Sequence, residues 1–156
     1  MSNTGGAGPK DPKAAASSRV PPQAPKPAAM PNAKAPMVLV VDDDSAIRTM
    51  LVRALGTTYI VYEASDGLEA RELLDRIPTP DAIVSDIMMP RLDGLGLAKL
   101  LRKDPTLQRV PLLFLTARGS PIDLVGGINA GARHYVTKPF KITEVLAKIA
   151  TMTKKR

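Results

Sequence analysis

The order of apolar and polar residues predicts strands and helices that alternate along most of the chain. Five short runs rich in aliphatic residues are typical of strands buried on both faces, and they span 38–41, 60–64, 82–85, 112–115 and 135–137. After each run, apolar residues recur at the spacing of one helix face, over 47–55, 67–77, 94–101, 121–130 and 142–152. The alternation predicts an α/β fold, (βα)5, with a doubly wound five-stranded parallel sheet.

Polar residues follow four of the five predicted strands. Asp42 and Asp43 follow the first strand, Asp86 the third, Thr116 the fourth and Lys138 the fifth. Because the carboxyl ends of parallel strands lie at one edge of the sheet, residues far apart in sequence meet there. We therefore expect three carboxylates, a hydroxyl and an ammonium group to share one crevice.

This set of side chains points to magnesium and phosphate chemistry. Clustered carboxylates repel one another unless a cation joins them, and ligands that are all oxygens suit Mg²⁺. Lys138 and Thr116 supply the positive charge and the hydrogen-bond donor that a phosphoryl group needs. One carboxylate can then act as a nucleophile and form an aspartyl phosphate. Each residue alone also has an ordinary explanation, such as a helix cap or a surface charge.

Four motifs together resemble the receiver domain of two-component response regulators. In chain order they are VLVVDDD at 38–44, SDIMMP at 85–90 with Asp93-Gly94, LTA at 115–117 and YVTKPF at 135–140. The match runs without gaps from about residue 37 to residue 156. It implies a flavodoxin-like strand order of 2-1-3-4-5. It also implies two kinds of protein partner, one that donates the phosphoryl group and one that receives the signal.

The resemblance assigns the carboxylates. Asp86 would be the phosphoacceptor, taking its phosphoryl group from the phosphohistidine of a sensor histidine kinase or a phosphotransfer protein. Asp42, Asp43 and Asp86, with the backbone carbonyl of Met88, would hold Mg²⁺. Phosphorylation and slow dephosphorylation would be self-catalysed, and no other enzymatic activity is expected.

The resemblance also implies a switch. Lys138 would contact the phosphoryl group, and Thr116 would move to form a hydrogen bond with it. Tyr135 would turn inward as Thr116 shifts, which would alter the surface formed by the fourth helix, the fifth strand and the fifth helix and so control a downstream effector protein. The Lys138–Pro139 peptide bond is usually cis in this family.

Two alternatives remain open at this point. A phosphohydrolase of the haloacid-dehalogenase type would use Asp42 as nucleophile and Asp44 as acid and base. A binding module of the same fold would not use phosphate at all. Which aspartate becomes phosphorylated distinguishes the three hypotheses.

Composition limits the remaining possibilities. The chain has no cysteine, which excludes disulfides and thiolate chemistry, and no apolar run long enough to span a membrane. We expect a cytoplasmic protein without membrane contact. The net charge of +7 is spread along the chain without interleaved aromatic residues, so direct binding to nucleic acid is not expected.

The first 36 residues differ sharply in composition from the rest of the chain. Residues 1–36 are rich in Pro, Ala and Lys and predict a disordered arm, whereas 37–156 would form the receiver domain, with no output domain after it. Arg133 and His134 replace acidic residues that support dimers in many family members. We therefore expect a monomer or a weak, phosphorylation-dependent dimer.

Overall fold

A five-stranded parallel sheet forms the centre of the molecule. The computed structural model describes residues 25–117 and 134–154. The strands are β2 (Met37–Val41), β3 (Ile60–Ala64), β4 (Ala82–Asp86), β5 (Leu112–Ala117) and β6 (His134–Lys138). All neighbours pair in parallel, and the order β3-β2-β4-β5-β6 is 2-1-3-4-5 in chain order. The predicted fold class and strand order are therefore confirmed.

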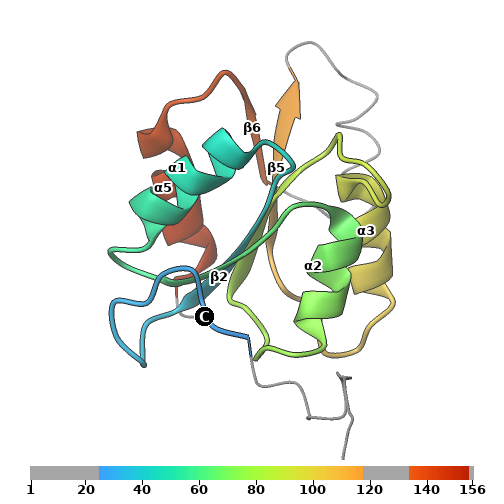
Figure 1. Cartoon of the computed structure of the whole chain (residues 1–156), viewed down its shortest axis with the longest axis horizontal. Helices are drawn as coiled ribbons and strands as arrows, with labels where there is room; N and C mark the ends of the chain where they lie inside the picture. Colours follow the sequence, from blue (N-terminus) through green and yellow to red (C-terminus); the bar gives the residue numbers. More distant parts are fainter. Residues whose placement is uncertain (1–24, 118–133, 155–156) are drawn as a thin grey trace, which may run out of the picture.

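Helices cover both faces of the sheet (Figure 1). The helices of the described residues are α1 (Ser45–Leu55), α2 (Gly67–Leu74), α3 (Gly94–Arg102) and α5 (Ile142–Met152). In Figure 1, α1 and α5 lie on one side of the sheet, and α2 and α3 lie on the other. The helix predicted at 121–130 lies outside the described residues. The helix predicted at 67–77 ends earlier, at Leu74, where Asp75 begins a turn.

Alternation within the strands explains the two-sided core. Val38 and Val40 belong to the apolar cluster under α1 and α5, whereas Leu39 and Val41 belong to the cluster under α2 and α3. Successive side chains of a strand point to opposite faces, so both faces of β2 are buried. A continuous aliphatic run is thus the sequence pattern that a sheet covered on both sides requires.

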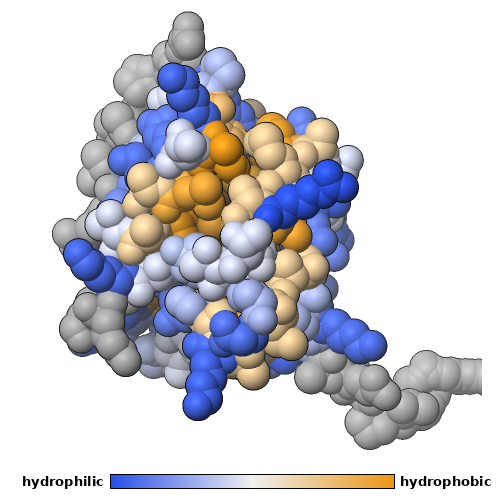
Figure 2. Space-filling view, turned by 90° about the vertical axis from the view of Figure 1, so that its left-hand side faces the viewer, coloured by the Kyte–Doolittle hydropathy of each residue, from blue (hydrophilic) through white to orange (hydrophobic). Residues whose placement is uncertain are grey.

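Part of the surface over α1 and α5 is apolar. Figure 2 shows this side of the molecule, where apolar residues gather in a patch among polar ones. Met50 on α1 is 41% exposed. Ile47, Ile142 and Leu146 are only partly buried against the cluster below them. Among the described residues, no helix is long and apolar enough to cross a membrane.

Aspartates begin three of the helices. The carboxylate of Asp44 accepts the amide hydrogens of Ala46 and Ile47 at the start of α1. Asp66 caps α2 and Asp93 caps α3 in the same way. These contacts satisfy amides that have no partner within the helix. Acidic residues near the strand ends therefore divide into helix caps and residues that face the crevice.

Residues 25–36, which the sequence assigned to the disordered arm, contact the sheet in the structure. Ala29 forms an isolated antiparallel bridge with Val61 of β3, and the hydroxyl of Tyr62 donates to the carbonyl of Pro25. Residues 25–36 use their backbone groups in these hydrogen bonds, which need no large apolar side chain in that segment. Composition alone therefore gave no sign of them.

Candidate functional site

Three carboxylates converge at the carboxyl ends of two neighbouring strands. Asp42 directly follows β2, and Asp86 is the last residue of β4 beside it. Asp42, Asp43 and Asp86 each place one carboxylate oxygen within 4.8 Å of the others. Asp42 and Asp86 are buried, whereas Asp43 is exposed. The predicted convergence of these three side chains occurs in the structure.

Lys138 brings a positive charge to the same carboxylates from β6. Its Nζ lies 3.1 Å from Oδ2 of Asp86 and 3.5 Å from Oδ2 of Asp42. Burial lowers the pKa of Lys138, but the hydrogen bond and charge of Asp86 and the charge of Asp42 outweigh burial and raise it. The side chain is therefore an ammonium ion at neutral pH. The Lys138–Pro139 peptide bond is cis, as the resemblance implied.

Asp42 has one carboxylate oxygen without a hydrogen bond. Oδ1 accepts the amide hydrogen of Asp44 at 2.9 Å, whereas Oδ2 is buried and has no hydrogen-bond partner in the structure; Lys138 approaches it only as an ion pair at 3.5 Å. Burial raises the pKa of Asp42, and the charge of Asp86 adds to that effect. A buried oxygen in this state is a ready ligand for a cation, because an ion would replace the missing partner.

The residues present thus fit a magnesium ion. All side-chain donors in the cluster are carboxylate oxygens, which Mg²⁺ prefers to nitrogen or sulfur. Asp43, being exposed, leaves one side open to water and to a phosphoryl group. The predicted backbone ligand, Met88, donates its amide hydrogen to Oδ1 of Asp86 at 3.4 Å; the role of its carbonyl remains a prediction.

The turn after β4 holds Asp86 close to α3. The hydroxyl of Ser85 donates to the carbonyl oxygen of Asp86, and the amide of Gly94 donates to the carbonyl of Ile87. A Cβ atom at Gly94 would collide with the carbonyl oxygen of Asp86 and with Cα of Ile87. Only glycine therefore allows the start of α3 to lie against the end of β4.

Thr116 and Tyr135 lie on neighbouring strands beside this cluster. Asp86 pairs with Leu115 across β4 and β5, so Thr116 is one residue further along β5, and it is buried. Tyr135 pairs with Phe114 across β5 and β6, with ring centroids 6.1 Å apart at 47°. Burial raises the pKa of the Tyr135 phenol. The predicted switch residues therefore occupy adjacent strands.

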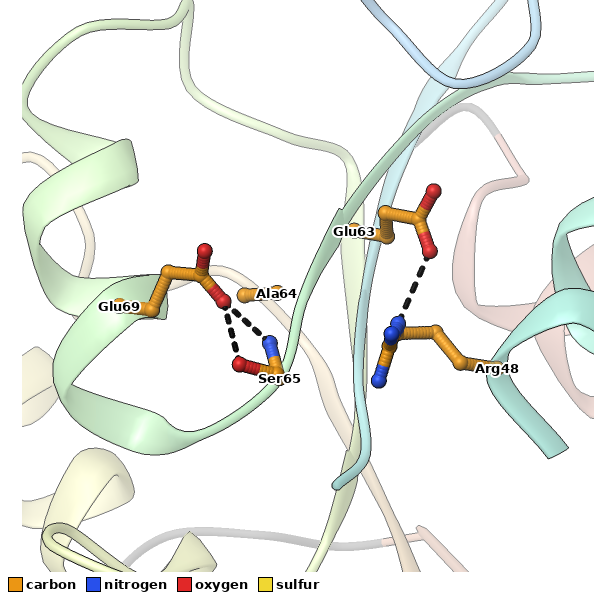
Figure 3. Close-up of a pocket in the computed structure, with 5 residues that line it drawn as sticks. All are labelled: Arg48, Glu63, Ala64, Ser65 and Glu69. Atoms are coloured by element: carbon orange, nitrogen blue, oxygen red, sulfur yellow. Dashed lines mark hydrogen bonds and ion pairs between the residues drawn. The ribbon is translucent and has the colours of Figure 1, made fainter. Parts of the chain in front are cut away.

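Two further charged residues, Arg48 and Glu63, support the Asp42 turn, and neither belongs to a sequence motif. Nη1 of Arg48, on α1, donates to the carbonyl oxygen of Asp42 at 2.7 Å. Its Nε lies 2.9 Å from Oε1 of Glu63 on β3, as Figure 3 shows. The Asp42 backbone is thus tied to both α1 and β3. A single Arg at helical spacing is common on any helix surface, so only the structure identifies this contact.

A shallow depression lies beside that pair. It is lined by Arg48, Glu63, Ala64, Ser65 and Glu69. Glu69 accepts hydrogen bonds from the amide and hydroxyl of Ser65 (Figure 3). The charged and polar side chains that line the depression are therefore paired with one another. Asp86 and Lys138 do not line it. We regard it as part of the support for the strand ends rather than as the reactive site.

A second support that sequence reasoning missed is Arg91, in the segment between β4 and α3. Arg91 has a positive φ of 66°, which non-glycine residues rarely adopt. Its guanidinium holds Oδ2 of Asp66 at 2.8 Å and 2.9 Å. Burial alone would raise the pKa of Asp66, but the amide of Glu69 and the Arg91 guanidinium outweigh it and lower the pKa.

Comparisons with a family model and with known proteins point to the same family. Residues 38–150 match the family described as the response regulator receiver domain. Response regulator MprA of Mycobacterium leprae (strain TN) is 46% identical over 119 residues, which are 76% of this chain and 51% of that protein. This chain therefore spans about half the length of the curated relatives it matches.

Solved structures agree with the sequence match. Chemotaxis response regulator CheY4 of Vibrio cholerae is 32% identical with a TM-score of 0.71, over 76% of this chain and 99% of that one. The receiver domain of sensor histidine kinase PA1611 from Pseudomonas aeruginosa PAO1 has a magnesium ion coordinated in its active-site cleft; it is 30% identical with a TM-score of 0.69, over 78% of this chain and 99% of that one. With its strand order and its cluster of strand-end carboxylates, this chain belongs to the response regulator receiver domain family.

Proposed function

We propose that this chain accepts a phosphoryl group on Asp86 and relays that event to a partner protein. The observation that carries the proposal is the pairing of Asp86, buried at the end of β4, with the Lys138 ammonium at 3.1 Å. A carboxylate so placed is fixed in direction and faces a fixed positive charge. That is the electrostatic setting that phosphoryl transfer requires.

Magnesium would be held by Asp42, Asp43 and Asp86, with the backbone carbonyl of Met88 as a further ligand. The fit rests on the all-oxygen cluster and on the unsatisfied Oδ2 of Asp42. When bound, the ion supplies positive charge that offsets the negative charge of the carboxylates and of the entering phosphoryl group. The related domain from PA1611 carries magnesium in its active-site cleft, which supports the assignment.

The transfer step follows from these positions. A carboxylate oxygen of Asp86 attacks the phosphorus of a phosphohistidine, so that a P–O bond forms as the P–N bond breaks. The electron pair of the P–N bond returns to the imidazole nitrogen of the donor, which takes up a proton from solvent. Lys138 remains protonated throughout and stabilises the negative oxygens, and the hydroxyl of Thr116 donates to one of them.

Phosphorylation would then change the surface near β6. The added phosphoryl group carries up to two negative charges and three acceptor oxygens. A shift of Thr116 toward them would open space beside β5, and Tyr135 on the neighbouring strand would fill that space. The packing of Tyr135 beside Phe114 supports this route, because any motion of the ring changes the outer surface around β6 and α5.

A protein partner fits this chemistry better than a nucleic acid or a membrane. The donor would be a sensor histidine kinase or a phosphotransfer protein, and the recipient of the signal a downstream effector protein, in the cytoplasm. The apolar patch over α1 and α5 (Figure 2) supports a protein contact, because contiguous exposed apolar surface marks such sites. Self-catalysed phosphorylation and slow dephosphorylation would be the only chemistry of the domain itself.

The hydrolase alternative needs Asp44 as an acid and base. The Asp44 carboxylate instead caps α1, accepting the amide hydrogens of Ala46 and Ile47 at 2.9 Å and 3.3 Å. A carboxylate that caps a helix in this way is not positioned to act as an acid and base at the strand ends. The phosphate-independent module would not need the Lys138 contact with Asp86. Neither alternative gains support from the geometry.

A phosphate-retarding gel tests the proposal. Wild type would be incubated with acetyl phosphate and Mg²⁺ beside Asp86→Asn and, as a matched control, Asp93→Asn. Asp93 is an exposed helix cap seven residues further along the chain, and Asn caps helices as well as Asp does. We expect a retarded band for wild type and for Asp93→Asn and none for Asp86→Asn. Retardation of Asp86→Asn, or none for wild type, would overturn the proposal.

A further inference from the structure

The outer edge of β3 has backbone groups that no other strand of the sheet can satisfy. The strand order places β3 at the end of the sheet, with β2 on its inner side. On that inner side the amide of Ile60 donates to the carbonyl of Pro36. Alternate residues of a strand direct their backbone groups to opposite sides, so Val61 directs its amide and carbonyl outward. An exposed edge of this kind invites pairing with another extended chain.

Residues just before the family match occupy that edge. The amides of Ala28 and Ala29 donate to the carbonyl oxygen of Val61 at 2.7 Å and 3.2 Å, and the amide of Val61 donates to the carbonyl of Ala29 at 2.8 Å. Both outward groups of Val61 are thus paired with residues 28–29. The pairing is antiparallel, in contrast to every other pairing in the sheet.

The side chain of Ala29 fits a notch that glycine creates. Ala29 packs against the apolar cluster under α1 and α5. A Cβ atom at Gly56, just after α1, would lie 2.6 Å from Cβ of Ala29, which is far inside van der Waals contact. Close packing of residue 29 against residue 56 therefore requires a small side chain at position 29 and glycine at position 56. Neither is explained by the phosphoacceptor site.

A turn returns the segment to the inner side of β3. The amide of Lys34 donates to Oδ1 of Asn32 at 2.9 Å, and the amide of Ala35 donates to the carbonyl of the same residue at 3.3 Å. Asn is favoured in such turns because its side chain replaces a backbone acceptor. The chain can thereby pair with β3 from outside and then enter β2 on the other side within a few residues.

We propose that the outer edge of β3, together with Gly56, is a docking site for an extended polypeptide segment with a small side chain, and that residues 25–30 of the same chain occupy it. Docking of extended backbone on a sheet edge is a general mode of peptide recognition. Occupied from within, the edge is closed to the backbone of a second copy. This role is independent of phosphorylation, and the docked segment precedes residues 38–150, which match the family.

Amide hydrogen exchange of the full chain, followed by NMR, tests the docking. We would compare wild type with Ala29→Asp and Ala29→Val, which place larger side chains against Gly56. The matched control is Ala28→Asp, because Ala28 is exposed and the substitution keeps its amide. We expect exchange of the Val61 amide to accelerate about tenfold or more in both position-29 variants. The Ile60 amide, which bonds on the inner side, should be unchanged and reports that β3 remains folded.

Three results would overturn the proposal. In the first, the Val61 amide of wild type exchanges as fast as an unprotected amide. In the second, Ala28→Asp accelerates Val61 as much as the position-29 variants do, so that the notch has no role. In the third, protection of Val61 rises with protein concentration, which would mean that a second copy supplies the docked segment. Protection that is independent of concentration and lost only at position 29 supports docking within one chain.

Discussion

At Asp42, burial and the nearby charge of Asp86 act in the same direction on one carboxylate. Both raise its pKa, and Oδ2 has no hydrogen-bond partner. Leaving such a group unsatisfied costs about 1–3 kcal/mol. The metal-free domain is therefore less stable than its packing allows, and this cost is concentrated in a residue proposed to bind magnesium.

Asp42→Asn should stabilise the metal-free domain. The substitution keeps the shape of the side chain and removes the buried charge beside Asp86. We expect this gain to exceed the loss of the 3.5 Å ion pair with Lys138. We expect the free energy of unfolding in EDTA to rise by about 1 kcal/mol, measured by urea denaturation at pH 7. Asp44→Asn is the control, since an Asn cap is equivalent to an Asp cap. A loss of stability in Asp42→Asn would contradict the account of this residue.

Asp66 should make stability depend on pH in the acid range. Its pKa is lowered below the ordinary 3.8 by the Glu69 amide and the Arg91 guanidinium, although burial opposes them. A lowered pKa means that the folded state binds the proton less readily than the unfolded state. The stabilising contribution is therefore complete above the unfolded pKa and is lost as the pH falls through the lower, folded pKa.

The comparison of wild type with Asp66→Asn isolates that contribution, because Asn keeps the helix cap. We expect wild type to be more stable by about 0.5–1 kcal/mol at pH 7, and the difference to shrink toward zero below pH 3.8. Urea denaturation at several pH values gives the two curves. A difference that stays constant down to pH 2 would show that the charge of Asp66 has no part in it.

Among the elements, the junction of β4 with α3 depends on glycine at one position. A Cβ at Gly94 would meet the backbone of Asp86 and Ile87, which cannot move without moving the proposed phosphoacceptor. A Cβ at Gly96, one half-turn further, would meet mainly the flexible end of Leu92. A side chain at position 94 would therefore displace backbone, whereas a side chain at position 96 would displace mainly the Leu92 side chain, although the two positions are only two residues apart on the same helix.

Gly94→Ala and Gly96→Ala form a matched pair. We expect Gly94→Ala to destabilise the domain by about 1–3 kcal/mol and to slow phosphorylation by acetyl phosphate. Gly96→Ala should be close to neutral, because loss of a helical Gly gains about as much as a small shift of Leu92 costs. Thermal unfolding and the phosphate-retarding gel measure both effects. Equal destabilisation by the two variants would refute the role given to Gly94.

For the whole molecule, magnesium should act as a stabilising ligand. A ligand that binds only the folded state raises its stability, by about 2.7 kcal/mol at a concentration 100 times the dissociation constant. We expect Mg²⁺ to raise the unfolding midpoint of wild type in a concentration-dependent way. Asp43→Asn should lose most of that rise and leave the metal-free midpoint nearly unchanged, because Asp43 is exposed. An equal rise in the variant would remove Asp43 from the set of ligands.

The sequence was sufficient to predict the sheet and the residues at its carboxyl edge. Aliphatic runs such as 38–41 predict doubly buried strands, and parallel topology predicts that Asp86 and Lys138 lie at the same edge of the sheet. Their 3.1 Å contact across β5 is known only from the structure. The helix at 67–77 was predicted three residues too long, since Leu74 is followed by a turn rather than by a break in the apolar pattern.

Contacts made by backbone groups or by single charges could not be predicted. The Pro- and Ala-rich segment that pairs with Val61 has no apolar periodicity, and its hydrogen bonds to Val61 join backbone groups, which leave no residue pattern in the sequence. Arg48 and Glu63 have the composition of any solvated surface, yet they hold the backbone of Asp42. Such supports have no pattern along the chain, because their partners are set by the tertiary fold.

Chemical mapping of the phosphorylated residue tests the central claim most directly. Protein treated with acetyl phosphate and Mg²⁺ would be reduced with borohydride, which converts an aspartyl phosphate to homoserine, and then sequenced by mass spectrometry. We predict homoserine at position 86 and none at position 42 or 43. Homoserine at position 42 would contradict the receiver mechanism in favour of the hydrolase, and its absence at every aspartate of the crevice would contradict phosphoryl transfer altogether.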